Sequence, residues 1–388
     1  MENVENTGYK QLPILKWTII FLKVMGAYRI KKNILSYFTM VSLVFLVFQI
    51  LLDMVLNWNG VETLKRVVFL PSMGLTTIKG VFLITQSNDF INIFDLLKYF
   101  WPIDMFQEES SKKMNKTIVL ITRIWISYVG MVFGCCLFMS LLPFLDFEGR
   151  TLMFSDFAFC DLKASLVCWV INYSWQFFLL YFQALPACLG FDLTFIILTG
   201  YIFIGCQMIK MGLKRLNTDD VVKRKFILRK IVDQHDFLLK FVATMNDMYT
   251  RMMFMQFYCS LWSLILVLYM IVADGMPPKL DSVTYFGSLY WALSCQLFMY
   301  SYSGTIIQTQ IRSLSTDIFN VDWFKKDSTH LREDLALMVL RSQNARILNA
   351  GKMSDLNLEL FVVTLKNSFS AFTLIWQVST AEPEALII

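Results

Sequence analysis

The chain has 388 residues, of which 56% are hydrophobic and only 17% are charged, and its formal net charge at pH 7 is +5. Soluble domains usually carry about 25% charged residues. With a mean hydropathy of +0.53, this composition predicts an all-α protein that crosses a membrane several times. The positive charge is small and no basic tract occurs, which excludes nucleic acid as a partner.

Seven apolar stretches have the composition of membrane-spanning helices. In chain order they are residues 34–56, 67–84, 118–142, 164–211, 237–273, 283–311 and 355–378. The fourth is far too long for one crossing and is interrupted by Pro186, Gly190 and Asp192, which predicts one kinked helix that continues beyond the bilayer. The second carries Lys79 inside it, which neighbouring helices must accommodate.

These spans divide the chain into five segments. Residues 1–33 are basic and predict a cytoplasmic amphipathic helix on the membrane surface. Residues 34–311 hold the first six spans with extended inner helical parts, and residues 312–352 predict a cytoplasmic loop and an amphipathic helix. The last span lies in residues 353–378, and residues 379–388 form an extracellular tail.

The distribution of lysine and arginine predicts the orientation, because these residues favour the cytoplasmic side. Twenty-five of them lie in the predicted inner segments and five in the outer ones. The N-terminus is therefore expected in the cytoplasm, and seven crossings then put the C-terminus outside the cell. A G-protein-coupled receptor, which is a first alternative with seven spans, has the reverse orientation. A secondary transporter is a second alternative, with residues 186–192 as its only candidate helix break.

Motifs of enzymes and metal sites are missing. The sequence contains no phosphate-binding glycine loop, no HExxH, no GxSxG and no dinucleotide fingerprint. His235 and His330 lie far apart in sequence, which makes a metal site unlikely to form. Cys160 and Cys168 flank a predicted outer loop in which a disulfide can form. We therefore expect no enzyme activity, no cofactor and no metal.

The last span carries a polar stripe. At about 100° per residue, five polar side chains fall on one side of the helix. They are Glu359, Lys366, Ser370, Thr373 and Gln377. Polar groups are costly in lipid, so this side should face protein or water. The stripe fits either a helix–helix contact or the lining of a pore.

The outer halves of the second, third, fourth and sixth spans combine aromatic, sulfur-containing and small residues. The candidates for ligand binding are Met73, Thr76, Gly130, Phe133, Gly134, Phe138, Tyr173, Phe177, Tyr181, Phe286 and Tyr290. Gly130 and Gly134 are four residues apart, a spacing that permits close contact between helices. The set fits ordinary packing in lipid, or a closed apolar pocket for a small volatile molecule.

The C-terminal third carries an ordered set of residues: His235, Gln256, Ser260, Gln296, Tyr300, Gly304, Trp323 and the closing motif LNLELFVVTLKNSFSAFTL at residues 356–374. In this set the chain resembles insect odorant receptors. The resemblance implies a ligand-gated, non-selective cation channel that works as a tetramer with the odorant co-receptor. It also implies the plasma membrane of olfactory neuron dendrites as the location, membrane lipid as surroundings, and a small volatile ligand.

The resemblance further implies roles for particular segments. The pocket lies between the second, third, fourth and sixth spans, and the inner parts of the last four spans form an anchor where subunits meet. The last span lines the pore. Ala371-Phe372 occupies the place of the family's Tyr-Phe pair, which puts the gate at Leu374, a polar pore residue at Gln377 and the outer constriction at Val378.

Overall fold

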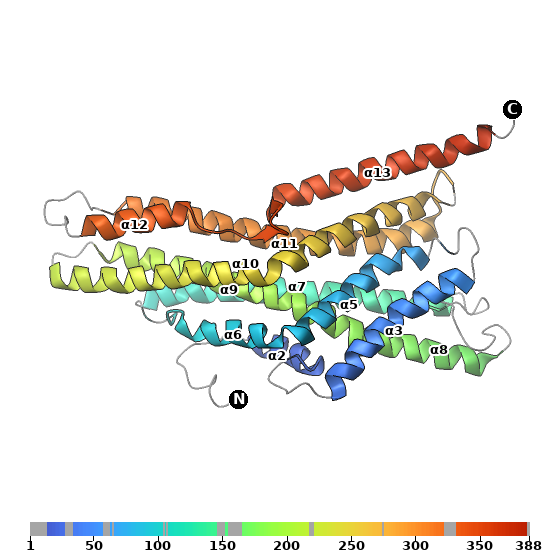
Figure 1. Ribbon diagram of the computed structural model, residues 1–388, viewed down its shortest axis with the longest axis horizontal. Helices are drawn as coiled ribbons and strands as arrows, with labels where there is room; N and C mark the ends of the chain where they lie inside the picture. The colour runs from blue at the N-terminus through green and yellow to red at the C-terminus, as the bar shows by residue number, and fades with distance from the viewer. Residues whose placement is uncertain are drawn as a thin grey trace.

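The computed structural model is almost entirely helical, as the sequence predicts, and its long helices run roughly along one common axis (Figure 1). It describes residues 14–27, 34–56, 63, 66–103, 105, 108–145, 152–153, 165–216, 221–273, 275–321 and 331–385. The first half of the chain contains α2 (Ile14–Val24), α3 (Ile34–Leu56), α5 (Phe69–Thr85), α6 (Ser87–Leu96), the 3-10 turn η1 (Leu97–Tyr99) and α7 (Glu108–Leu145). The second half contains α8 (Leu166–Phe178), the π-helical turn η2 (Leu179–Ala184), α9 (Leu185–Lys214), α10 (Val221–Val272), α11 (Leu280–Phe319), α12 (Arg332–Gln343), β1 (Asn349–Ala350), β2 (Ser354–Asp355) and α13 (Leu358–Ala385).

Five of the described helices are long and apolar enough to cross a membrane. They are Ser36–Leu56, Met114–Leu141, Leu166–Lys214, Val222–Val272 and Leu358–Ser379. The second predicted span is the shorter apolar helix α5, which has 17 residues. The sixth is α11, whose 40 residues mix apolar and polar character.

The fourth span is one long helix with an irregular turn, as predicted. The irregularity is η2, where the π-helical pattern widens the helix just before Pro186. Proline is tolerated there because it occupies the first turn of α9. The helix then continues regularly through Gly190 and Asp192 to Lys214. Helix α9 packs against α2, α5, α7, α10 and α11, so it forms the centre of the bundle.

Several helices are longer than the sequence predicts. The structure starts α7 ten residues before the predicted position, at Glu108, and α10 sixteen residues before, at Val221. The charged residues 221–236 were expected to lie before the fifth helix, whereas they form its first turns. With 52 residues, α10 is about 78 Å long, more than twice the thickness of a hydrocarbon core. Its charged half therefore extends beyond any bilayer.

A close contact at a glycine of α9 holds the segment after α6 in place. A Cβ atom on Gly205 of α9 would lie 2.8 Å from the Phe100 ring, so only glycine fits here. Phe100 in turn packs edge-to-face on Phe237 and Phe241 of α10, with ring centroids 5.0 Å apart in both pairs. This contact fixes the segment after α6 against the two central helices.

Two expectations about the ends of the last helix need correction. A two-stranded hairpin, β1–β2, precedes α13 and was not predicted. The helix does not end at Val378, because it continues to Ala385. Most of residues 379–388 therefore extend α13 rather than forming a separate tail. Figure 1 shows α13 along one side of the molecule, beside the C-terminal half of α10.

Candidate functional site

The start of α13 is fastened to α10 by the β1–β2 hairpin. Three residues, Gly351, Lys352 and Met353, connect its strands, and the first two have positive φ, of 64° and 61°. The Gly351 N–H donates to the Thr250 carbonyl at 2.9 Å, and the Thr250 hydroxyl donates to Asn349 Oδ1 at 2.5 Å. The hairpin thus ties the chain between α12 and α13 to the middle of α10.

The same segment is held even more closely by α11. A Cβ atom on Gly304 would lie 1.9 Å from the Leu356 carbonyl oxygen, so this backbone contact requires glycine. Two residues later, the Leu358 N–H donates to Thr305 Oγ1 at 3.0 Å. Asn357 caps the helix, because its Oδ1 accepts from the Leu360 N–H at 2.9 Å. The first turn of α13 therefore has a fixed position on α11.

Beyond this turn, α13 has a buried face and an open face. Thr364, Ser368 and Phe372 are buried against α10 and α11. Phe361 contacts Phe298 of α11, with ring centroids 5.7 Å apart, and further along Trp376 contacts Tyr269 of α10 at 6.5 Å.

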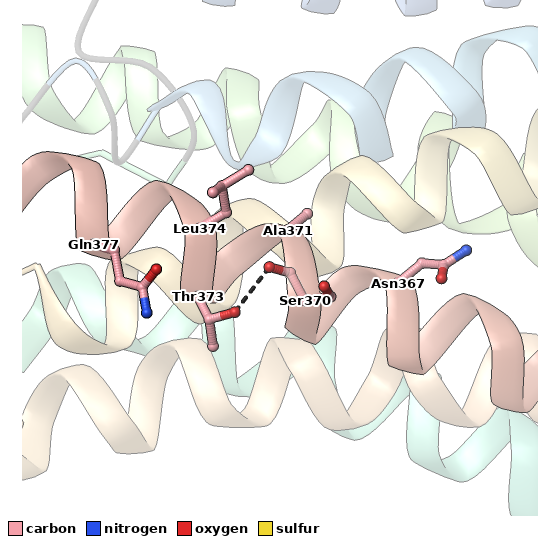
Figure 2. A pocket seen from close by; sticks show the side chains of 6 residues that line it. All are labelled: Asn367, Ser370, Ala371, Thr373, Leu374 and Gln377. Carbon is pink, nitrogen blue, oxygen red and sulfur yellow. Dashed lines mark hydrogen bonds between the residues drawn. The ribbon is translucent and has the colours of Figure 1, made fainter.

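The predicted pore residues lie on the open face. Glu359, Lys366, Ser370, Leu374, Gln377 and Val378 are exposed, and Thr373 is half-buried. The hydroxyl of Thr373 donates to the Ser370 carbonyl at 2.8 Å. Figure 2 shows the groove along this face, lined by Asn367, Ser370, Ala371, Thr373, Leu374 and Gln377. Three members of the polar stripe, Glu359, Lys366 and Ser370, are therefore not buried against another helix in the described part of this chain.

Four of the predicted ligand-binding residues form one aromatic cluster between α7 and the α8–η2 helix. The Tyr181 ring lies 5.8 Å from Phe133 and 4.3 Å from Phe177, measured between centroids. Tyr173 lies 6.3 Å from Phe177. Both tyrosine hydroxyls bind Ser140 of α7, that of Tyr173 at the carbonyl (2.7 Å) and that of Tyr181 at the hydroxyl (3.0 Å).

The other candidates for ligand binding lie on α5, α7 and α11. Met73 and Thr76 are on α5, and the Thr76 hydroxyl donates to the Ser72 carbonyl at 2.9 Å. Phe286 is buried on α11, next to Tyr285, whose ring contacts Phe69 of α5 at 6.3 Å. Met73, Thr76, Phe138 on α7 and Tyr290 on α11 are all half-buried.

The two glycines of α7 do not make the close helix contact predicted for them. Gly130 and Gly134 are both exposed, and no atom of another helix lies within 4 Å of the position that a Cβ would take on either one. They lie on the outward face of α7, so within this chain they do not add to the walls of a pocket.

A buried ionic cluster is the main feature that the sequence did not assign to a site. Lys79 of α5 and Asp192 of α9 are 1% and 2% exposed, and Lys79 Nζ lies 2.7 Å from Asp192 Oδ1. The only sign of this ion pair in the sequence is one lysine inside the second apolar span and one aspartate inside the fourth. Their separation of 113 residues conceals the pairing.

The other residues noted in the sequence have structural partners or fall outside the description. His235 Nε2 lies 2.7 Å from Ser342 Oγ, which joins α10 to α12. Cys168 is disulfide-bonded, whereas Cys160, the partner considered for it, is not among the described residues. Trp323 also lies outside them.

The comparisons with known proteins all match odorant or olfactory receptors. A family model described as 7tm Odorant receptor matches residues 59–369. Odorant receptor 33c of Drosophila melanogaster is 25% identical over 259 residues, which are 65% of this chain and 65% of that protein. Odorant receptor 82a of the same species is 28% identical over 148 residues, or 38% of this chain and 37% of that protein. These matches span less than two thirds of the relatives' own length.

Solved structures give the broadest match. The insect olfactory receptor OR5 from Machilis hrabei, in complex with eugenol, superposes with a TM-score of 0.79 at 14% identity, over 94% of this chain and 98% of that chain. The same receptor in its other structure gives a TM-score of 0.76 with the same coverage. At this identity the likeness shows a shared fold.

Proposed function

This chain belongs to the insect odorant receptor family and is a membrane-embedded, multi-pass protein, and from this premise we propose that it is one subunit of an odorant-gated, non-selective cation channel. It acts in a heterotetramer with the odorant co-receptor, in the plasma membrane of olfactory neuron dendrites. The N-terminus lies in the cytoplasm and the C-terminus outside. The inner half of the bundle, with α12, serves as the anchor between subunits.

The open face of α13 is the observation that carries this proposal. A helix apolar enough to span a membrane leaves Glu359, Lys366, Ser370 and Gln377 without burial in its own chain. Polar groups in lipid need water or protein partners, so this face must meet a pore or another subunit. Leu374, which is 63% exposed, lies among the polar lining residues of the groove. An apolar ring at that level closes a pore by excluding water.

The ligand site lies in the outer half of the bundle. The aromatic cluster of Phe133, Tyr173, Phe177 and Tyr181 supports an apolar site whose few hydroxyls are already engaged. Such walls suit a small, largely apolar volatile molecule. The molecule opens the channel only if it binds the open arrangement better than the closed one. The outer part of α13 then moves away from the axis, and Leu374 and Val378 no longer exclude water.

Patch-clamp recordings of cells that express this chain with the co-receptor test the pore assignment. Leu374→Ala shortens the apolar gate, and we expect agonist-independent current to rise by about tenfold, which corresponds to roughly 1.4 kcal/mol in the closed–open equilibrium. Gln377→Ala should change the relative permeability of cations. Ile375→Ala is the matched control, because Ile375 is exposed on α13 but does not line the groove. Wild-type gating and permeability in both variants would refute the pore role.

Two alternative functions, a G-protein-coupled receptor and a secondary transporter, are distinguished from this proposal by the membrane orientation and by the continuity of the helices. An epitope at residue 1 that antibodies reach only after permeabilisation supports the cytoplasmic N-terminus, and one reached on intact cells supports a G-protein-coupled receptor. A secondary transporter builds its substrate site at discontinuous helices. Helix α9 is continuous through Gly190 and Asp192, which argues against such a site at residues 186–192.

A further inference from the structure

We propose that Lys79 and Asp192, together with Tyr128, Gln296 and Tyr300, form a positioning cluster that couples the outer pocket to the start of α13. The inference rests on the proposed function, because it describes how one subunit passes ligand occupancy to its pore helix. These five residues do not touch the ligand. They determine how α5, α7, α9 and α11 move relative to one another.

Asp192 is the centre of the positioning cluster. Lys79 Nζ donates to its Oδ1 at 2.7 Å, and Gln296 Nε2 donates to its Oδ2 at 2.7 Å. The hydroxyls of Tyr128 and Tyr300 donate to the same carboxylate, one to each oxygen. The ammonium group of Lys79 also faces the Tyr300 ring, 5.4 Å from its centroid. One carboxylate therefore binds side chains from three other helices.

The positioning cluster lies directly inward of the residues proposed for the pocket, on the same helices. On α5, Thr76 precedes Lys79 by three residues, or about 4.5 Å along the axis. On α11, Tyr290 precedes Gln296 by six residues, or about 9 Å. Both helices run inward along the chain, so the positioning cluster forms the floor below the proposed pocket. A molecule that separates the pocket walls acts first on this floor.

Helix α11 carries the connection onward to α13. Tyr300 is followed one turn later by Gly304, the residue on which the Leu356 backbone rests. Thr305 then accepts the Leu358 N–H at 3.0 Å. The residues that bind Asp192 and the residues that hold the first turn of α13 thus lie on one continuous helix. A shift of α11 at Gln296 and Tyr300 is therefore transmitted to the pore helix.

Helix α10, the other support of α13, is joined to the same positioning cluster. Gln256 Nε2 donates to Gln296 Oε1 at 3.1 Å and lies 2.9 Å from Ser260 Oγ. The Gln256 Oε1 atom is buried without a hydrogen-bond partner in the described part of the chain. Buried acceptors are rarely left unpaired. This unused acceptor gives the positioning cluster a second arrangement, which becomes available when α10 and α11 shift.

The chemistry explains why such a cluster transmits movement. Apolar helices slide over one another gradually, whereas a buried carboxylate must keep its charged and hydrogen-bonded partners or exchange them together. The four helices therefore move as a unit between discrete arrangements. That behaviour is what a channel with a closed and an open state requires.

The experiment compares two neutralised ion pairs in the full receptor expressed with the co-receptor. Lys79→Met with Asp192→Asn removes both charges of the positioning cluster and nearly retains the side-chain volumes. Asp53→Asn with Arg66→Met is the matched control, since Arg66 Nε lies 3.0 Å from Asp53 Oδ2 in another buried pair, whose two residues are not members of the positioning cluster. The experiment measures the amount of receptor at the cell surface and the agonist-independent current. It also measures the half-maximal concentrations for octanol, hexanal, acetophenone and ethyl butanoate.

We expect the K79M/D192N receptor to reach the surface and to shift its half-maximal concentrations or its agonist-independent current by about tenfold, with unchanged cation permeability. The control pair should leave gating as in the wild type. Gating values of K79M/D192N equal to those of the wild type overturn the proposal. A shift of the same size in the control pair also overturns it.

A second variant covers the case in which the doubly neutralised receptor does not reach the surface. Tyr300→Phe removes one hydroxyl and leaves both charges in place, and we expect its half-maximal concentrations or its agonist-independent current to shift by about threefold; wild-type gating in Y300F overturns the proposal. A wild-type complex without odorant-evoked current refutes the proposed function and the coupling with it. A responsive wild type beside unchanged variants refutes the coupling alone.

Discussion

Helices α9 and α13 are both apolar enough to cross a membrane, yet they have opposite surroundings. The span Leu166–Lys214, which includes α9, is 89% buried in its most apolar window, whereas the span Leu358–Ser379 of α13 is 11% buried. Asp192 of α9 binds side chains from three other helices of its own chain. On α13, by contrast, Glu359, Lys366 and Ser370 are exposed. Hydropathy thus identifies a membrane span. The burial of that span shows whether its polar residues bind other helices of the same chain or are exposed on its surface.

The largest effect on stability is expected at Asp192, the buried charged residue of α9. Asp192→Ala leaves the Lys79 ammonium group buried without its counter-ion, and we expect a loss of about 3–5 kcal/mol of stability. The same substitution at Glu359, on the open face of α13, should change stability by less than about 0.5 kcal/mol. Thermal unfolding of the detergent-solubilised protein measures both. A wild-type melting temperature in D192A would mean that water reaches the Lys79 side chain.

A smaller effect is expected where α13 is held most closely. Gly304→Ala puts a methyl group 1.9 Å from the Leu356 carbonyl oxygen, so the backbone must shift. We expect a cost of about 1–3 kcal/mol and altered gating. Gly287→Ala is the control on the same helix, because no atom lies within 4 Å of its Cβ position; it should be neutral or stabilise by about 0.5–1 kcal/mol. Equal melting temperatures for the two variants would contradict the close contact.

The smallest effects are expected in α12, which packs against α10 and α11, and in the segment that follows it. Ser342→Ala removes the buried hydrogen bond to His235 and should cost about 1 kcal/mol. Arg346→Ala removes an ion pair with Asp247 in which the side chains are 70% and 62% exposed. That pair should contribute less than about 0.5 kcal/mol and weaken further with added salt. Melting temperatures at low and high ionic strength distinguish the two contributions; a larger loss for R346A than for S342A would reverse the expected order.

The sequence predicted the elements whose signal is local. The first span coincides with α3, because Ile34–Leu56 contains only one charged residue, Asp53, and is bounded by polar residues. Pro186 marked the irregular fourth helix to within a few residues of the π-helical turn η2. The resemblance carried by Gln256, Gln296 and the closing motif is confirmed by the family match. Helix starts were missed where charged residues begin a helix, as in α7 and α10, since charge marks exposure rather than the absence of helix.

The sequence by itself therefore determined the helical membrane fold, most of the spans and the polar stripe on the last one, because hydrophobic periodicity and breaker residues act over a few turns. Only the tertiary structure decided what those features face. It paired Lys79 with Asp192, placed Leu356 against Gly304, and turned Gly130 and Gly134 outward. It also left the polar stripe of α13 open. Such pairings depend on how helices far apart in the sequence pack, and side-chain periodicity along one helix carries no information about that.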